Sequence, residues 1–254
     1  MTAPVEIERH GSTLVIAINR PAQRNAVNRA VSLAIAAALD TLDADPALRV
    51  GIVTGRGSSF CSGMDLRAFV DGERPELEGR GFAGITEAPP VKPLIAAVEG
   101  YALAGGCELA LACDLIVASE DACFGLPEVT RGLVAGSGGL VRLPQRIPPA
   151  IALEYALTGA RMDARTAHGW GLVTRLTPPG DARAEALILA ARISANAPLS
   201  VAMSKRIVRE SGTWQAETLW ETQRALVEPV LASKDAAEGA RAFAEKRNPV
   251  WSGS

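Results

Sequence analysis

The sequence predicts an α/β fold, because short β-branched segments alternate with stretches whose apolar residues recur at helical spacing. The first observation is a pair of β-branched runs, residues 5–9 and 13–19, joined by His10-Gly11-Ser12, which is typical of a hairpin. The second is the helix that Asn28 is placed to cap. Its apolar positions repeat at helical spacing: Val31, Ile35, Leu39 and Leu42.

The middle of the chain continues the alternation. Residues 49–54 read as a buried strand that ends at a glycine- and serine-rich turn. Residues 71–93 contain four glycines and four prolines, which predicts a mobile excursion with a short helix. Strand, helix and strand are then expected over residues 94–98, 106–112 and 115–119, so the core needs crossover connections between strands.

The last third is predominantly helical. Helix-forming sequence begins at Pro148 and is interrupted by the short apolar stretch 171–176 and by Pro178-Pro179. After Ala197-Pro198 the helical pattern continues almost to residue 254. We therefore predict two parts: a core over residues 1–195 that carries the candidate functional site, and a helical C-terminal subdomain over residues 196–254.

Composition excludes several classes of function. The chain has 254 residues and a formal net charge of -2, and no basic excess argues for nucleic acid or for an anionic membrane surface. It has four cysteines, none in a CxxC pair, and two histidines, so we expect no metal site and free thiols in a reducing cytoplasm. Its first residues lack the pattern of a secretory signal. The apolar stretch 94–119 carries Glu99, Glu108 and Asp114, which would be costly in lipid.

Three segments contain residues that could take part in catalysis. Residues 59–66 and 102–108 each hold a glycine turn, the second opening into a helix, and residues 124–128 form a strand-like run that ends in a carboxylate. Glycines before a helix leave backbone N–H groups free to hold an oxygen that becomes negative during reaction. Close packing against a neighbouring strand is the alternative explanation of these glycines.

The two carboxylates in these segments are Glu108 and Glu128. The helix dipole alone accounts for Glu108 in a first turn, and Glu128 has the alternative of capping a turn or pairing with Arg131. However, the residues after Glu108 are apolar, and desolvation raises the pKa of a carboxyl group and prepares it for proton transfer.

The three segments resemble the crotonase (enoyl-CoA hydratase/isomerase) superfamily in order and spacing, and the likeness covers essentially the whole chain. Residues 81–87 and 248–251 are most similar to the crotonobetainyl-CoA hydratase (carnitinyl-CoA dehydratase) branch. Further matching segments are residues 20–21, 25–27, 136–139, 142–143, 157–159, 169–173 and 242–247.

The resemblance implies a fold and an assembly. The fold is a crotonase-type spiral of β-β-α units followed by a helical subdomain that mediates oligomerisation, as a trimer or a dimer of trimers. The apolar positions of the last helices would then be shared between core packing and the subunit interface, plain intrachain core being the alternative. These positions are Trp214, Leu219, Trp220, Leu226, Val230 and Leu231.

The resemblance also implies a role for each matching residue. The N–H groups of Met64 and Gly105 would form an oxyanion hole for the thioester carbonyl. Glu108 would activate water, and Glu128 would exchange a proton at the α-carbon. Residues at matching positions would bind coenzyme A, which is part of the substrate and not a separate cofactor: Arg24, Asn25, Ala26, Ser62, Gly63, Asp65 and Leu66, with Phe243 and Lys246 often completing the site of a neighbouring subunit.

We therefore predict an enoyl-CoA hydratase that adds water reversibly, with syn geometry, to a 2-trans-enoyl-CoA thioester to give a 3-hydroxyacyl-CoA. Many hydratases have alanine where this chain has Met64, which leaves the acyl group open. A Δ3,Δ2-enoyl-CoA isomerase typically relies on the carboxylate at the position of Glu128 alone, so two carboxylates favour the hydratase. The remaining alternatives are a crotonobetainyl-CoA hydratase-like enzyme, a cysteine nucleophile at Cys61 or Cys107, a non-catalytic acyl-CoA-binding protein and an RNA-binding relative.

Overall fold

The computed structural model describes residues 3–254 and contains a six-stranded sheet. The first two strands form the predicted antiparallel hairpin, and every later neighbour in the sheet is parallel. Because parallel neighbours need crossovers, the segments between the strands pack on the faces of this sheet. In spatial order the strands are β1 (Val5–His10), β2 (Thr13–Ile18), β3 (Val50–Gly55), β4 (Leu94–Val98), β6 (Leu115–Ser119) and β9 (Arg175–Thr177).

A second, three-stranded sheet lies beside the first. It consists of β5 (Tyr101–Leu103), β7 (Cys123–Gly125) and β8 (Met162–Asp163), in that order. The chain passes from β4 to β5 through a two-residue connection, and it passes from β6 to β7 in the same way through a three-residue connection. This repeated passage between the two sheets is the β-β-α spiral that the sequence predicts.

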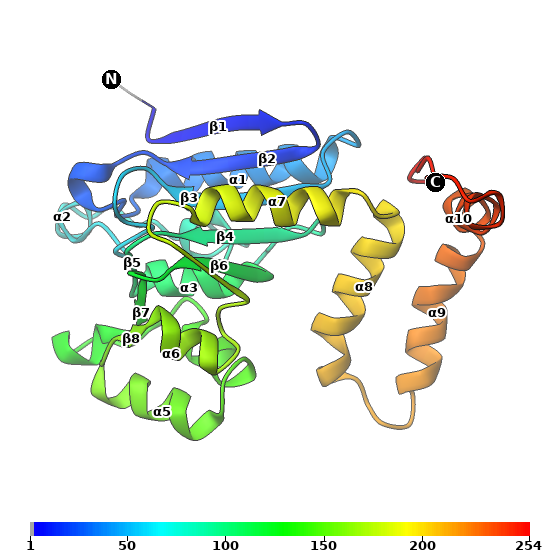
Figure 1. Ribbon diagram of the computed structural model, residues 1–254. Helices are drawn as coiled ribbons and strands as arrows, with labels where there is room; N and C mark the ends of the chain where they lie inside the picture. Colours follow the sequence, from blue (N-terminus) through cyan, green and yellow to red (C-terminus); the bar gives the residue numbers. More distant parts are fainter. Residues whose placement is uncertain (1–2) are drawn as a thin grey trace.

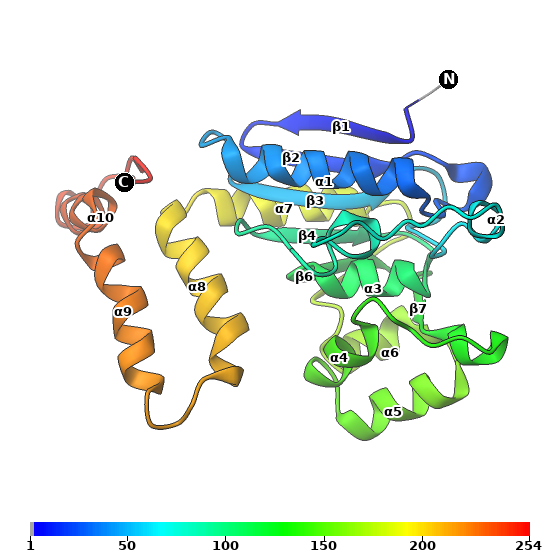
Figure 2. The ribbon, with the colours of Figure 1, turned by 180° about the vertical axis from the view of Figure 1, so that it is seen from behind.

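Helices cover both faces of the larger sheet (Figures 1 and 2). On one face lies α1 (Arg29–Ala44), where the side chain of Asn28 accepts a hydrogen bond from the Val31 N–H, as predicted. On the other face lies α7 (Ala182–Ser194), whose alanines let the helix approach the strands closely. These contact residues are Ala182, Ala186 and Ala190.

The segment 71–93 is packed more closely than its composition indicates. The short helix expected there is the 3-10 helix η2 (Phe82–Gly84). Phe82 and Ile85 are buried, and η2 lies against α1. A Cβ on Gly84 would come within 2.5 Å of the Ser32 carbonyl oxygen, so glycine permits this contact. The expectation of a loose excursion is therefore wrong for residues 82–86, which are all buried.

The remaining elements include the last three helices, α8 (Pro198–Glu210), α9 (Leu219–Leu231) and α10 (Lys234–Glu245). Figure 1 shows α8 and α9 side by side, directed away from the sheet. The predicted boundary at residues 195–196 falls in the turn between α7 and α8. Shorter elements are η1 (Pro21–Gln23), α2 (Leu66–Val70), α3 (Gly105–Ala112), η3 (Pro127–Arg131), α4 (Gly139–Arg142), η4 (Leu143–Gln145), α5 (Pro149–Thr158), α6 (Ala164–Gly169) and η5 (Ser211–Thr213).

Within residues 3–254, no single helix is both long and apolar enough to cross a membrane. Only the sharply bent pair formed by α7 and the segment 198–213 passes that test, and only when the two are taken together.

Candidate active site

Glu108 lies in the first turn of α3, a helix in which every residue is buried. Its side chain reaches the loop at the start of α4, where Oε1 accepts hydrogen bonds from the Ser137 N–H at 2.7 Å and the Gly139 N–H at 2.9 Å. Burial raises the pKa of Glu108, and these two donors oppose the rise because they stabilise the ionised form. The two hydrogen bonds thus hold the carboxyl group in one orientation, while burial keeps its pKa above the ordinary value.

Glu128 is placed by η3, which begins at Pro127 directly after the strand β7 and the linking residue Leu126. Its Oε2 atom is buried and has no hydrogen-bond partner among the described residues. Burial raises the pKa of Glu128, and the negative charge of Glu108 raises it further. No ion pair with Arg131 forms within residues 3–254, so the alternative explanation by charge pairing does not hold.

The two carboxylates approach each other around the start of α4. A Cβ on Gly139 would lie 2.9 Å from Cγ of Glu108 and 3.0 Å from a methyl carbon of Leu126, two residues before Glu128. The absence of a side chain at residue 139 therefore lets the Glu108 side chain and the start of η3 pack together.

Two backbone N–H groups are available beside these carboxylates. Across the described chain, neither the Met64 N–H nor the Gly105 N–H donates to a backbone acceptor. The two segments are adjacent, because a Cβ on Gly63 would lie 3.2 Å from the Gly105 nitrogen. Ala104, which precedes this donor, has φ +52°, a region that L residues rarely adopt. Free donors at a helix start are suited to stabilising a developing negative charge.

A groove of about 880 Å³ opens beside these donors. The predicted CoA-binding residues on its wall are Arg24, Ala26, Ser62, Met64, Asp65 and Leu66. Asp65 also forms a 2.8 Å ion pair with Arg20 and caps α2, which fixes this side of the groove.

Some predicted CoA-binding residues lie elsewhere. Asn25 is fully buried beneath the groove, where its side chain donates to the Ser59 carbonyl and accepts from the Arg20 N–H. Its side chain therefore shapes the turn and does not line the groove wall, unlike the role first expected. Phe243 and Lys246 belong to α10 and its C-cap, far from the groove of the same chain (Figure 1).

Two cationic groups of the groove were not anticipated as ligand-binding residues. Arg131 and Arg161 both line it, and Arg161 shares the ring of Tyr101 with Arg24, at 5.4 and 5.5 Å from the ring centroid. These arginines come from distant parts of the sequence, and only the position of Arg161 just after the matching segment 157–159 pointed to the site. Guanidinium groups at a groove favour phosphate ligands.

An apolar cavity of about 400 Å³ lies on the other side of Glu128, between η3, α4 and α5. Among the described residues, Glu128 supplies the one charge in its lining. The remaining lining residues are aliphatic or proline: Leu126, Val129, Val134, Ala135, Leu140, Leu143, Pro144, Pro149, Ala152, Leu153, Ala156 and Leu157.

The cysteines are not arranged as nucleophiles. Burial raises the pKa values of the Cys61 and Cys107 thiols to about 12, so both are protonated at neutral pH. His10 contacts Glu8, and His168 contacts the Val173 carbonyl, so neither acts as a base toward a thiol. Within residues 3–254 no group of three or more His, Cys, Asp or Glu side chains could hold a metal ion.

Comparison with known proteins identifies the family of the chain. Residues 8–254 match the family model described as enoyl-CoA hydratase/isomerase. Over the full length of both chains, the protein is 58% identical to an enoyl-CoA hydratase from Mycobacterium marinum, with a TM-score of 0.98. It is 44% identical, also over both full lengths, to a carnitinyl-CoA dehydratase from Salmonella enteritidis. A carnitinyl-CoA hydratase from Mycobacterium avium has 45% identity, full coverage of both chains and a TM-score of 0.80. The chain therefore belongs to the enoyl-CoA hydratase/isomerase (crotonase) family and is an enzyme of the hydratase/lyase kind.

Proposed function

We propose that the protein is an enoyl-CoA hydratase that adds water reversibly to a 2-trans-enoyl-CoA and gives a 3-hydroxyacyl-CoA. One observation carries this proposal: a buried carboxyl group, Glu108, and a half-buried one, Glu128, both with raised pKa values, accompany two backbone N–H groups that have no backbone acceptor among the described residues. An isomerase needs one proton-transferring carboxylate, whereas addition of water needs a base for the water and an acid for the α-carbon.

The proposed reaction assigns a separate task to each group. The N–H groups of Met64 and Gly105 hold the thioester carbonyl oxygen, which becomes negative as oxygen bonds to the β-carbon. Ionised Glu108 takes a proton from the attacking water, and protonated Glu128 gives its proton to the α-carbon. The C=C double bond becomes a single bond, and the charge on the carbonyl oxygen is released. Losing one such N–H donor costs on the order of 3 kcal/mol in a comparable site.

The groove and the apolar cavity suggest how the substrate lies. The arginines at the groove, Arg24, Arg131 and Arg161, are suited to the phosphates of coenzyme A. The aliphatic cavity beside Glu128 is suited to an uncharged acyl chain, because burying a charge without a partner costs several kcal/mol. We therefore expect apolar enoyl chains to be preferred.

A carnitinyl-CoA dehydratase is the second candidate, since relatives with that name are 44% identical over their full length. The substrate in that name carries a quaternary ammonium group, for which aromatic faces or carboxylates are the usual partners. Glu128 is the one charged residue that the described lining of the cavity offers, and its proposed task is proton transfer.

The test is hydration of crotonyl-CoA, longer straight-chain enoyl-CoAs, a steroid side-chain enoyl-CoA and crotonobetainyl-CoA. Hydration is measured as the loss of the conjugated-thioester absorbance. We expect hydration of the uncharged chains and slow or no reaction of crotonobetainyl-CoA. Conversion of a 3-enoyl-CoA without any hydration would support the isomerase. Tight binding of CoA esters without turnover would support a non-catalytic binding protein.

The two carboxylates are tested by Glu108→Gln and Glu128→Gln. Each variant should bind acyl-CoA normally and lose at least about 100-fold in kcat, the scale expected for general acid or base catalysis. Glu154→Gln, on the exposed side of α5, is a matched control that should keep full activity. Near-normal turnover in either site variant would remove that residue from the mechanism.

A further inference from the structure

The hydrogen bonds that orient Glu108 come from an irregular loop. Ser137 lies before α4, and Gly139 is its first residue, while Gly138 between them has φ +96°. Residues 131–134 and Gly136, which lead into this loop, are exposed. A loop with this environment needs a further contact to hold its two donors at hydrogen-bond distance from Glu108.

Arg142 supplies that contact from the end of α4. Its Nη1 donates to the Ser137 carbonyl at 3.3 Å, and its Nη2 donates to the Thr86 carbonyl. The guanidinium group lies directly against Gly138, because a Cβ there would fall 2.0 Å from Nη1. Thr86 belongs to the buried segment around η2, so Arg142 connects the Glu108 loop to a rigid part of the core.

The charge of Arg142 is not used in an ion pair anywhere in residues 3–254. Burial lowers its pKa, as does the nearby Arg209, so the chain bears a cost for placing a guanidinium group here. A planar group with five donors in fixed directions is suited to joining two carbonyl oxygens on different segments.

We propose that Arg142 is a positioning residue for Glu108: it holds the 137–139 loop so that the Ser137 and Gly139 N–H groups meet the carboxylate that activates water. This inference rests on the proposed hydratase function. Arg142 touches no reacting atom in this scheme and acts through the loop. A misplacement of about 1 Å in a reacting group costs on the order of 100-fold in rate, which sets the size of the effect.

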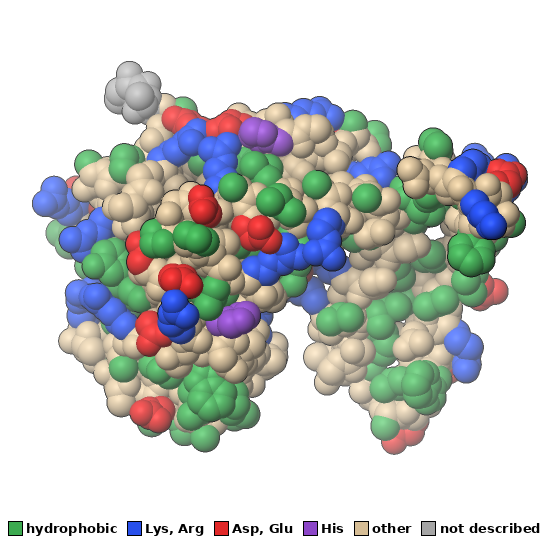
Figure 3. All heavy atoms as spheres, viewed as in Figure 1, with side chains coloured by type: hydrophobic (Ala, Val, Ile, Leu, Met, Phe, Trp, Pro, Cys, Tyr) green, Lys and Arg blue, Asp and Glu red, His purple; other side chains and the backbone are tan. Residues whose placement is uncertain are grey.

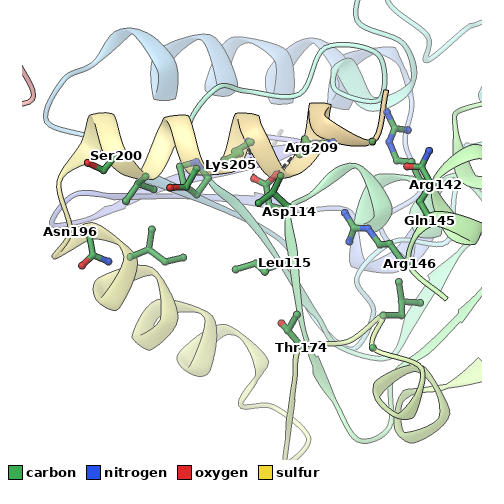
Figure 4. Close-up of a pocket in the computed structure, with 18 of the residues that line it drawn as sticks. Asp114, Leu115, Arg142, Gln145, Arg146, Thr174, Asn196, Ser200, Lys205 and Arg209 are labelled. Carbon is green, nitrogen blue, oxygen red and sulfur yellow. Dashed lines mark hydrogen bonds and ion pairs between the residues drawn. The ribbon is translucent and has the colours of Figure 1, made fainter. Parts of the chain in front are cut away.

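Arg146 provides a matched control. It lies four residues further along and lines the same cleft of about 1130 Å³ (Figure 4). It also donates to backbone carbonyls, those of Leu111 and Cys113. None of its hydrogen bonds reaches the 137–139 loop. Removing either arginine therefore removes a half-buried cation and its carbonyl contacts, but only one removal frees the loop.

The variants are Arg142→Met, Arg142→Lys and Arg146→Met, compared on the enoyl-CoA that the wild type hydrates best. For Arg142→Met we expect kcat to fall about 30- to 100-fold with KM changed less than about threefold, and Arg142→Lys should recover part of the loss. Arg146→Met should stay within about threefold of wild type per folded enzyme. Equal losses in both methionine variants would overturn the proposal.

The pH profile separates positioning from general stability. The groups that face Glu108 are Arg142 on α4, Glu128 on η3 and Cys107 on α3 itself. Loss of two N–H donors and one cation favours protonated Glu108, so the acidic limb of kcat/KM should move to higher pH in Arg142→Met and stay in place in Arg146→Met. If the acidic limb of kcat/KM in Arg142→Met stays at the wild-type pH, the proposal is overturned.

A chemical rescue covers the case in which Arg142→Met folds poorly. Arg142 lines a cleft of about 1130 Å³ in the single chain, so methylguanidinium is added to Arg142→Ala to fill the space that the missing side chain leaves there. We expect tens of millimolar methylguanidinium to restore its activity at least about fivefold and to have no effect on Arg146→Ala. Equal rescue of both variants would contradict the proposal. Failure to rescue Arg142→Ala, when that variant is folded, would contradict it as well. A wild type that hydrates no enoyl-CoA would instead overturn the proposed function.

Discussion

The two carboxyl groups of the site differ in how their oxygens are satisfied. Glu108 accepts two backbone hydrogen bonds, whereas Oε2 of Glu128 is buried without a partner among the described residues. A carboxyl group in the second situation favours its protonated form, which is the form that can donate to carbon. The difference in environment therefore agrees with the assignment of Glu108 as base and Glu128 as acid.

The same burial predicts that Glu128→Gln stabilises the protein. The folded-state pKa of Glu128 is raised above its ordinary value of 4.5, so the native state loses stability as pH rises from about 4.5 through the folded pKa. Glutamine does not ionise and avoids this loss. Calorimetry at pH 7 should show a higher Tm for the variant, by about 2–4 °C for each kcal/mol relieved.

At pH 4 or below the advantage should disappear, because the wild-type group is then protonated in both states. The exposed Glu154→Gln variant should show no change at either pH. A lower Tm for Glu128→Gln at pH 7 would contradict the assignment of desolvation as the main cause.

At the scale of elements, α8 has no fully buried residue, and ion pairs join it to the core. Asp114, between α3 and β6, pairs with Lys205 at 2.7 Å and Arg209 at 2.9 Å, and Figure 4 shows these side chains meeting. Lys205 also donates to two backbone carbonyls in the segment that leads into β4, those of Pro90 and Lys92.

Asp114→Ala should therefore destabilise the protein by about 3 kcal/mol, since it leaves Lys205 poorly exposed and without its counter-charge. Urea unfolding measures the change. The control is Glu210→Ala, which removes the solvent-exposed pair with Arg206 and should cost less than about 1 kcal/mol. A loss no larger than that of the control would show that α8 is held by other contacts.

Elements with local signals were predictable from sequence. The bounds of β4 and β6 match the predicted residues, and Asn28 caps α1 as its side chain and position indicate. The run ending at Glu128 was less predictable: β7 stops at Gly125 and a 3-10 helix begins at Pro127. A short apolar run has too few residues to separate strand from turn.

The candidate site likewise contains some residues that the sequence could identify and others that it could not. Glu108, Glu128, Met64 and Gly105 stand in local motifs that the sequence displays, although their catalytic roles remain predictions. Arg142 and the segment around Thr86 are 56 residues apart and meet only through the fold. No periodicity or spacing in a single sequence could reveal such a contact.

At the scale of the whole molecule, the C-terminal helices leave large apolar side chains exposed. None of the predicted shared positions on α9 is buried, and Trp220 and Leu231 are well exposed, so the intrachain-core alternative is wrong for them. Figure 3 shows a deep hollow between the lobe that carries α5 and the pair α8–α9. Exposed apolar side chains that lie close together favour a protein–protein interface.

We therefore expect a trimer or a dimer of trimers in solution, measured by light scattering and sedimentation. Trp220→Glu should weaken the assembly, whereas Glu217→Gln, an exposed change in the preceding turn, should leave the mass unchanged. A stable wild-type monomer at micromolar concentration would contradict the expected assembly. Phe243 is 88% exposed, so if a neighbour's groove receives it, Phe243→Ala should raise KM for the CoA ester more than it lowers kcat.

The buried thiols have a practical consequence for measuring motion. Cys61 lies beside Gly63, Cys107 lies in the first turn of α3 and Cys113 ends that helix, and each thiol is inert to alkylation while it stays buried and protonated. Modification of any of them therefore requires that part of the molecule to open first. The rate of alkylation of each thiol under native conditions therefore measures how often that part of the molecule opens. Acyl-CoA binding should slow the alkylation of Cys61 and Cys107 more than that of Cys113.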